Sequence, residues 1–213
     1  MLGVSALLLL LVSSALSWRG NLEGAEVDTF RAVNDLPGWL RDAMWLFMQL
    51  GWIGAVAVVA VVGGLITRKW LVSVAVIVAG VVTWLLAKEV KDAVERARPP
   101  AYLNDVHLRE GSGLGLGFPS GHAAIAGAMV TVLWPHCGKT MRVVIVTLAL
   151  LVSLARVYFG VHFPLDVIGG AALGVVVGLI VNWTLALLPR PQSGGAPRAD
   201  QSALPQPKSE PRP

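Results

Sequence analysis

The segment "ARVYFGVHFPLD", residues 155–166, places an arginine, a histidine and an aspartate between two long apolar runs. Arg156 lies at the end of the first run, where an arginine either extends to the lipid headgroups or binds an anion. With Pro164 at the first position of the next helix, Asp166 falls at N3, where a side chain can reach back as in a capping box. Its carboxylate could then meet His162 and make the other ring nitrogen a better nucleophile or base.

A second histidine begins another predicted helix. In "PSGH", residues 119–122, Ser120 is well placed to be the N-cap, which leaves the amides of Gly121 and His122 unpaired and pointing outward. Such amides, with the positive end of the helix dipole behind them, form an anion site. A serine cap precedes many helices, so the specificity of this segment comes from His122.

Two cations precede these segments. The stretch "KEVKDAVERARPP" continues a helical pattern from the apolar run before it, and Pro99 is expected to stop that helix. Lys91 and Arg98 are seven residues apart, which places them within about 20° of one helix face, so both can point at one anion. A solvated juxtamembrane helix with i, i+4 ion pairs is the alternative interpretation.

The elements that carry these residues are strongly apolar. The 213 residues are 55% hydrophobic and 14% charged, and the mean hydropathy is +0.67, which is typical of an integral membrane protein. The predicted fold class is all-α, a polytopic membrane helix bundle with six transmembrane helices. The expected spans are about 2–18, 44–67, 71–87, 122–134, 143–159 and 165–188.

Two of the expected spans have alternatives. The run 122–134 has only about 13 apolar residues, so it spans only if its helix continues into the next turn or the local bilayer is thin. The run 2–18 resembles a signal peptide, because a small-residue stretch follows a leucine tract. No basic residue precedes Arg19, however, so an uncleaved helix is favoured.

The short turns between spans indicate an orientation. They carry four basic residues and no acidic one: Arg68, Lys69, Lys139 and Arg142. By the positive-inside rule, this face and both termini are cytoplasmic. The segments that carry the candidate site residues then lie on the extracytoplasmic face. Residues 1–188 are expected to form one membrane domain. Residues 189–213, rich in proline, glycine and serine, are expected to be a disordered cytoplasmic tail.

Several classes of function are disfavoured. A single cysteine, Cys137, allows no internal disulfide and no cysteine-based metal cluster. No compact group of Asp and Glu suits a magnesium ion, so neither a metal nor another cofactor is expected. The pI of about 9.6 comes without a basic block interleaved with aromatic residues, so nucleic acid is not an expected partner.

In order along the chain, "KDAVERARP", "PSGH" and "ARVYFGVHFPLD" resemble the three signature motifs of the type 2 phosphatidic acid phosphatase (lipid phosphate phosphatase) superfamily. Those motifs are K-x6-RP, PSGH and SR-x5-H-x3-D. The resemblance covers residues 91–166, and all but one of the defined positions agree. The departure is Ala155, where the pattern has serine, so any hydrogen bond from that hydroxyl to a phosphate is absent.

The resemblance implies a role for each matching residue. The implied phosphate-binding residues are Lys91, Arg98, Ser120, Gly121 and Arg156. His162 is implied to attack phosphorus and give a phosphohistidine, with Asp166 supporting it and His122 protonating the leaving oxygen. Water then releases phosphate, and no metal is required. Three cations and helix-end amides suit the charge that spreads over phosphoryl oxygens during transfer.

The sequence therefore predicts a metal-independent membrane lipid phosphatase, whose partners are a lipid phosphate substrate and membrane lipids. Candidate substrates are isoprenyl diphosphates such as undecaprenyl diphosphate, phosphatidylglycerophosphate and phosphatidic acid, and the resemblance favours the first two. One alternative is a lipid phosphotransferase that uses the same intermediate. The other is a non-enzymatic transporter or structural membrane protein whose charges line a pathway. The oligomeric state is not defined by the sequence.

The loop before PSGH holds further polar residues, His107, Arg109 and Glu110. They either contact the lipid headgroup or are ordinary solvated loop residues, and the second interpretation is favoured. Residues 28–47 have apolar side chains at helical spacing and could lie along the membrane interface near the site.

Overall fold

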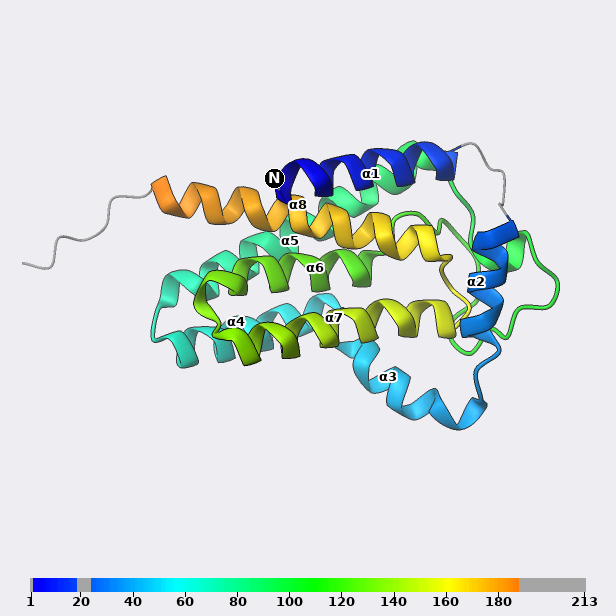
Figure 1. Cartoon of the computed structure of the whole chain (residues 1–213), viewed down its shortest axis with the longest axis horizontal. Coiled ribbons are helices and arrows are strands. Elements are labelled where there is room, and N and C mark those ends of the chain that lie inside the picture. Colours follow the sequence, from blue (N-terminus) through cyan, green and yellow to red (C-terminus); the bar gives the residue numbers. More distant parts are fainter. Residues whose placement is uncertain (1, 19–23, 188–213) are drawn as a thin grey trace, which may run out of the picture.

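The computed structural model describes residues 2–18 and 24–187, and this part of the chain is a helical bundle (Figure 1). The elements in chain order are α1 (Leu2–Trp18), α2 (Gly24–Asn34), η1 (Gly38–Leu40), α3 (Arg41–Gln49), α4 (Ile53–Thr67), α5 (Trp70–Val94), η2 (Pro99–Ala101), α6 (Gly121–Leu133), η3 (Trp134–His136), α7 (Lys139–Tyr158) and α8 (Pro164–Leu187). The all-α prediction is confirmed for these residues. The predicted tail, 189–213, lies outside them.

Three helices in the described ranges, α5, α7 and α8, are long and apolar enough to cross a membrane. Helices α3 and α4 make a fourth span if they are counted together, although they are bent by 63° relative to each other. Helix α1 is apolar but has 17 residues, and α6 has 13, which is short for about 30 Å of hydrocarbon. The described residues therefore support three or four spans, and six transmembrane helices are not confirmed.

The prediction of one continuous span over 44–67 is wrong. The chain turns between α3 and α4, and Gly51 in this turn lies directly against the start of α6. A Cβ atom at Gly51 would stand 2.8 Å from the carbonyl oxygen of His122 and 2.7 Å from the Val152 side chain. Helix α3 instead buries Met44 and Met48 against the end of α7. Because the helix breaks here, α3 as well as the turn before α4 lies beside the predicted site.

The prediction that the third span continues as a helix to Pro99 is also wrong. Helix α5 ends at Val94, because Glu95 adopts a left-handed conformation with φ 53°. Arg98 is extended, with ψ 162°, as the residue before a proline prefers. Lys91 and Arg98 therefore do not share a helix face, and a turn of the chain brings them together instead.

Helices α6 and α8 pack closely because α8 has glycine at every fourth residue of one face. Gly170, Gly174 and Gly178 lie against the backbone of α6 and its N-cap. Small residues at this spacing let membrane helices approach at backbone distance. The contact fixes where both helices begin, and both of the predicted histidine segments lie at those beginnings.

Gly174→Ala is expected to destabilise the protein by about 1–3 kcal/mol, as overpacking of a tight contact does. A Cβ atom there would overlap the Ala124 carbonyl oxygen and stand 2.7 Å from the Ala128 nitrogen, and neither backbone atom can move freely. The measurement is the unfolding temperature of the purified protein in detergent. Gly138→Ala is the control, since a Cβ atom at Gly138 meets nothing within 4 Å. Equal unfolding temperatures for the two variants would contradict this packing.

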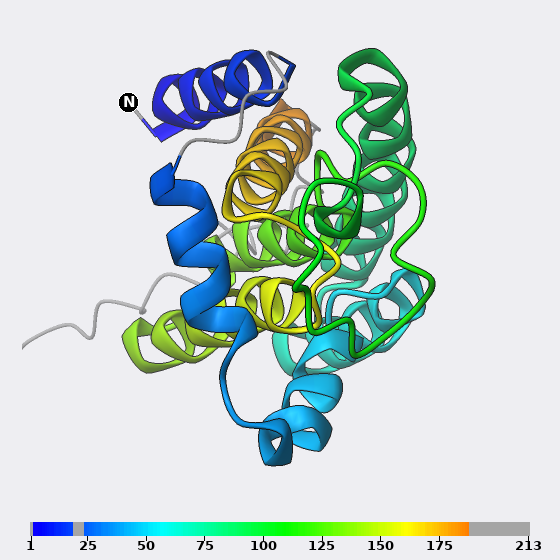
Figure 2. The same cartoon turned by 90° about the vertical axis from the view of Figure 1, so that its right-hand side faces the viewer.

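The predicted motif segments gather at one end of the bundle. In Figure 1 the starts of α6 and α8 and the ends of α5 and α7 point toward the right, where α2 crosses the end of the bundle. Figure 2 views this end and shows α2 beside α8, with the long loop before α6 on the other side. The turns after α4 and α6 lie at the opposite end.

Candidate active site

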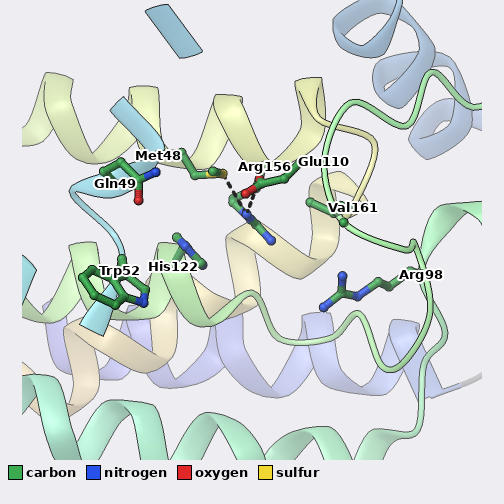
Figure 3. A pocket seen from close by; sticks show the side chains of 9 residues that line it. Met48, Gln49, Trp52, Arg98, Glu110, His122, Arg156 and Val161 are labelled. Carbon is green, nitrogen blue, oxygen red and sulfur yellow. Dashed lines mark hydrogen bonds and ion pairs between the residues drawn. The ribbon is translucent and has the colours of Figure 1, made fainter. Parts of the chain in front are cut away.

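A cavity of about 320 Å³ lies where α4, α5, α6 and α7 meet the loop before α8. Six of the eight predicted site residues line it: Lys91, Arg98, Gly121, His122, Arg156 and His162. A second hollow of about 410 Å³ adjoins it, shares four lining residues with it and adds Glu110 (Figure 3). The structure therefore brings all three motif segments to one cavity.

Asp166 holds the loop that carries His162. Asp166 Oδ2 accepts a hydrogen bond of 2.9 Å from the Phe163 N–H, so the predicted capping-box contact at the start of α8 is confirmed. The same oxygen lies 3.4 Å from His162 Nδ1. His162 Nδ1 therefore faces the carboxylate, although it makes no hydrogen bond within the described ranges.

The surroundings of His162 favour its uncharged imidazole. Burial, together with the nearby cations Arg156, Lys91 and Arg98, lowers the pKa of His162 well below its usual value. A neutral imidazole keeps the lone pair that a nucleophile needs. Burial and the three nearby cations thus both disfavour protonation of this histidine.

The loop before α6 holds two of the cations. Lys91 Nζ donates to the carbonyl oxygens of Leu116 at 3.1 Å and Gly117 at 3.0 Å. Arg98 Nε donates to the Leu116 carbonyl at 3.5 Å. Lys91 and Arg98 therefore converge through a shared backbone contact.

Arg156 is the third cation and is nearly buried. Its Nη1 lies 2.8 Å from Met48 Sδ and 3.5 Å from Glu110 Oε2 (Figure 3). Its Nε has no hydrogen-bond partner among the described residues. Arg156 lines both hollows, so its guanidinium is placed beside any anion bound there, while its Nε remains buried.

Ser120 and Asp166, the other two predicted site residues, are buried and do not line the cavity. Ser120 is the N-cap of α6, as expected, but its hydroxyl has no partner within the described ranges. Its N–H donates to the Asp166 carbonyl at 2.8 Å and joins the starts of α6 and α8. The structure thus places Ser120 behind the wall of the cavity.

Ala155, which departs from the motif, is fully buried. It belongs to an apolar cluster with Met44 and Met48 of α3 and Tyr158 of α7. It does not line either hollow. Alanine is compatible with this environment, whereas a serine hydroxyl there would need a hydrogen-bond partner.

The sequence analysis missed the acidic residues around the site. Glu110, interpreted as a solvated loop residue, pairs with Arg156. Glu26 and Arg96 form buried ion pairs beside Asp166. The sequence offers no local signal for these contacts, because the partners are far apart along the chain.

Two other polar residues of this loop, Arg109 and His107, lie away from the cavity. Arg109 donates to the carbonyl oxygens of Asn34 at 2.7 Å and Tyr158 at 2.8 Å, and so anchors the loop to α2 and α7. His107 is exposed and pairs with Asp35. Neither residue lines the cavity. In residues 2–18 and 24–187, no group of three or more His, Cys, Asp and Glu could hold a metal ion.

The fold and the cavity define an all-helical membrane protein in which three cations and two imidazoles line one cavity. Residues 68–189, more than half of the chain, match the PAP2 superfamily. The chain belongs to this superfamily, and its members are phosphatases that act on lipid phosphate esters.

Curated and solved relatives agree with this assignment. The chain is 31% identical to an undecaprenyl-diphosphatase of Sulfolobus acidocaldarius, over 71% of this chain and 74% of that protein. It is 34% identical to a decaprenylphosphoryl-5-phosphoribose phosphatase of Mycobacterium tuberculosis, over 71% and 83%. The fold is similar to that of the PAP2-type phosphatidylglycerolphosphate phosphatase of Bacillus subtilis, with a TM-score of 0.69, 24% identity, and coverage of 88% of this chain and 98% of that one.

Proposed function

We propose that this protein hydrolyses the phosphomonoester or diphosphate head of a membrane lipid through a phosphohistidine on His162. The observation that carries the proposal is the single cavity that Lys91, Arg98, Arg156, His122 and His162 line together. Three cations suit the charge on phosphoryl oxygens in the transition state. Two imidazoles supply a nucleophile and an acid.

The proposed reaction has two steps. In the first, His162 Nε2 attacks phosphorus while the bond to the leaving oxygen breaks. His122 gives that oxygen a proton, which it holds once the bound phosphate offsets the charge of the cavity cations. In the second, water attacks the phosphohistidine, His122 takes a proton from the water, and the N–P bond breaks to release phosphate. The three cations and the Gly121 amide bind the phosphoryl oxygens in both steps. The Ser120 hydroxyl joins this set only if the start of α6 rearranges.

The apolar side of the cavity suggests where the lipid chain lies. Its lining includes Trp52 and Ile53 at the start of α4, Trp84 on α5 and Ile125 on α6. Trp52 and Trp84 are also exposed. The phosphate would occupy the cationic end, while the chain leaves between α4 and α5 toward the lipid.

We propose an isoprenyl phosphate or diphosphate as the substrate class. Two relatives, an undecaprenyl-diphosphatase and a decaprenylphosphoryl-5-phosphoribose phosphatase, are named for substrates with isoprenyl chains. Phosphatidylglycerophosphate and phosphatidic acid are the alternative substrates to be tested beside it. We further propose six membrane crossings with cytoplasmic termini, so that the cavity opens on the extracytoplasmic side.

Phosphate release from purified lipids tests this proposal. The protein in detergent, with a chelator present, is given undecaprenyl diphosphate, phosphatidylglycerophosphate or phosphatidic acid, with water as the sole acceptor. We expect phosphate release that the chelator does not reduce, with the highest kcat/KM for undecaprenyl diphosphate. Failure to release phosphate from any lipid, or a requirement for added divalent cations, would contradict the proposal. Transfer only to a second lipid would indicate a phosphotransferase.

Glu110→Gln is expected to strengthen inhibition by inorganic phosphate about two- to fivefold. The Glu110 carboxylate, 3.5 Å from Arg156, competes with a phosphate for this guanidinium, and a partly exposed ion pair contributes roughly 0.2–1 kcal/mol. The measurement is the inhibition constant of phosphate at fixed ionic strength. Asp35→Asn, which removes the partner of the exposed His107, should leave that constant unchanged. Weaker inhibition in Glu110→Gln would show that Glu110 assists anion binding.

A further inference from the structure

A buried ion network lies behind the His162–Asp166 pair. Arg96, in the loop after α5, pairs with Glu26 of α2 at 2.6 Å and with Asp166 of α8 at 3.1 Å. All three side chains are at least nine-tenths buried. Arg96 Nη1 also lies 3.3 Å from Ser17 Oγ on α1. One guanidinium therefore joins the loop to three helices.

The network orients the Asp166 carboxylate. Oδ1 accepts from Arg96 Nη1 at 3.1 Å, while Oδ2 accepts from the Phe163 N–H and faces His162 Nδ1. The carboxylate cannot rotate without losing one of these contacts. A Cβ atom at Gly117 would lie 2.9 Å from Oδ2, so the loop before α6 also packs against this oxygen.

Glu26 fixes both Arg96 and the start of α8. Its two oxygens bind the guanidinium in a bidentate arrangement, at 3.1 Å and 2.6 Å. Oε1 also accepts from the Leu165 N–H at 3.1 Å. Helix α2 is thereby attached to the first turn of α8, one residue from Asp166.

Stability alone is a weak reason for such a network. Removing charges from water is costly, and a buried ion pair is often no more stable than apolar side chains of similar volume. Neither Glu26 nor Arg96 lines the cavity, so neither is placed to contact a substrate. Their shared contact with the active-site residues is Asp166, which in turn faces His162.

We propose that Glu26 and Arg96 are positioning residues for the phosphatase reaction: they hold the Asp166 carboxylate ionised and oriented toward His162. Arg96 supplies the positive charge and fixes the carboxylate plane, and Glu26 fixes Arg96. The inference rests on the proposed function, since it concerns how the nucleophile of that reaction is oriented. It predicts an effect on turnover but not on phosphate binding.

The test compares Arg96→Gln with the double variant Glu26→Gln/Arg96→Gln. The single variant leaves two buried carboxylates without their cation, so both its unfolding temperature and its kcat should fall. The double variant removes one of these negative charges and should recover much of the unfolding temperature. Its kcat should remain about 10- to 100-fold below that of the wild type, because Asp166 still lacks its guanidinium.

The readouts are kcat and KM for phosphate release, the inhibition constant of inorganic phosphate, and the unfolding temperature in detergent. KM and the phosphate constant should stay within about twofold of wild type in the double variant, because the cavity cations are intact. Arg31→Gln is the matched control. It removes another ion pair of α2, an exposed one with Asp105, and should change none of the four quantities.

Three results overturn the inference. Recovery of kcat together with the unfolding temperature in the double variant would show a purely structural role. A weaker phosphate constant in parallel with the loss of kcat would place the network in anion binding. An inactive wild type would refute the proposed function and the inference with it, whereas an active wild type and an equally active double variant would refute the inference alone.

Discussion

His162→Ala is expected to lower the rate of phosphate release by about 10⁴-fold or more, the size of effect seen when a covalent nucleophile is removed. KM should change little, since the three cations that bind the phosphate remain. A quench with radiolabelled substrate should trap an acid-labile phosphoprotein in the wild type and none in the variant.

His136→Ala is the matched control for this variant. His136 lies in η3, in the turn after α6 at the opposite end of the bundle, so its loss should leave the rate unchanged. A phosphoprotein that persists in His162→Ala would assign the covalent intermediate to another residue. Activity within tenfold of wild type would remove His162 from the mechanism altogether.

His122→Asn is expected to have an effect that depends on the leaving group. With phosphatidic acid the leaving group is a lipid alkoxide, which needs a proton, so loss of the general acid should lower kcat by about 10²- to 10⁴-fold. With a lipid diphosphate the leaving group is a lipid phosphate. Its second pKa is about 6, so it leaves as a stable anion without help. There the loss should be much smaller.

The ratio of the two losses is the measurement, obtained from initial rates on both lipids with the same protein sample. Arg156→Lys serves as a comparison, because a residue that binds phosphoryl oxygens should affect both substrates alike. Equal losses for the two lipids in His122→Asn would assign His122 to phosphate binding rather than to proton transfer. A larger loss on the diphosphate would contradict the general-acid role.

The sequence by itself determined the local features of this protein. Apolar runs predict α5, α7 and α8, because backbone groups in lipid must be paired within a helix. Pro164 and Asp166 define the start of α8, because capping depends on neighbours within four residues. Ser120 marks the start of α6 by position, although its hydroxyl makes no capping hydrogen bond there. The three motif segments identified six residues that the structure places around one cavity.

The tertiary structure decided what depends on partners distant in the chain. The break before α4 follows from the contact of Gly51 with α6, and the apolar run through residues 53–67 does not reveal it. Glu26 and Arg96 are 70 residues apart, as are Arg96 and Asp166, so their ion pairs exist only once α2, the loop after α5 and α8 pack together. Propensities and caps act over a few residues, whereas the ion pairs beside Asp166 are set by packing of the whole bundle.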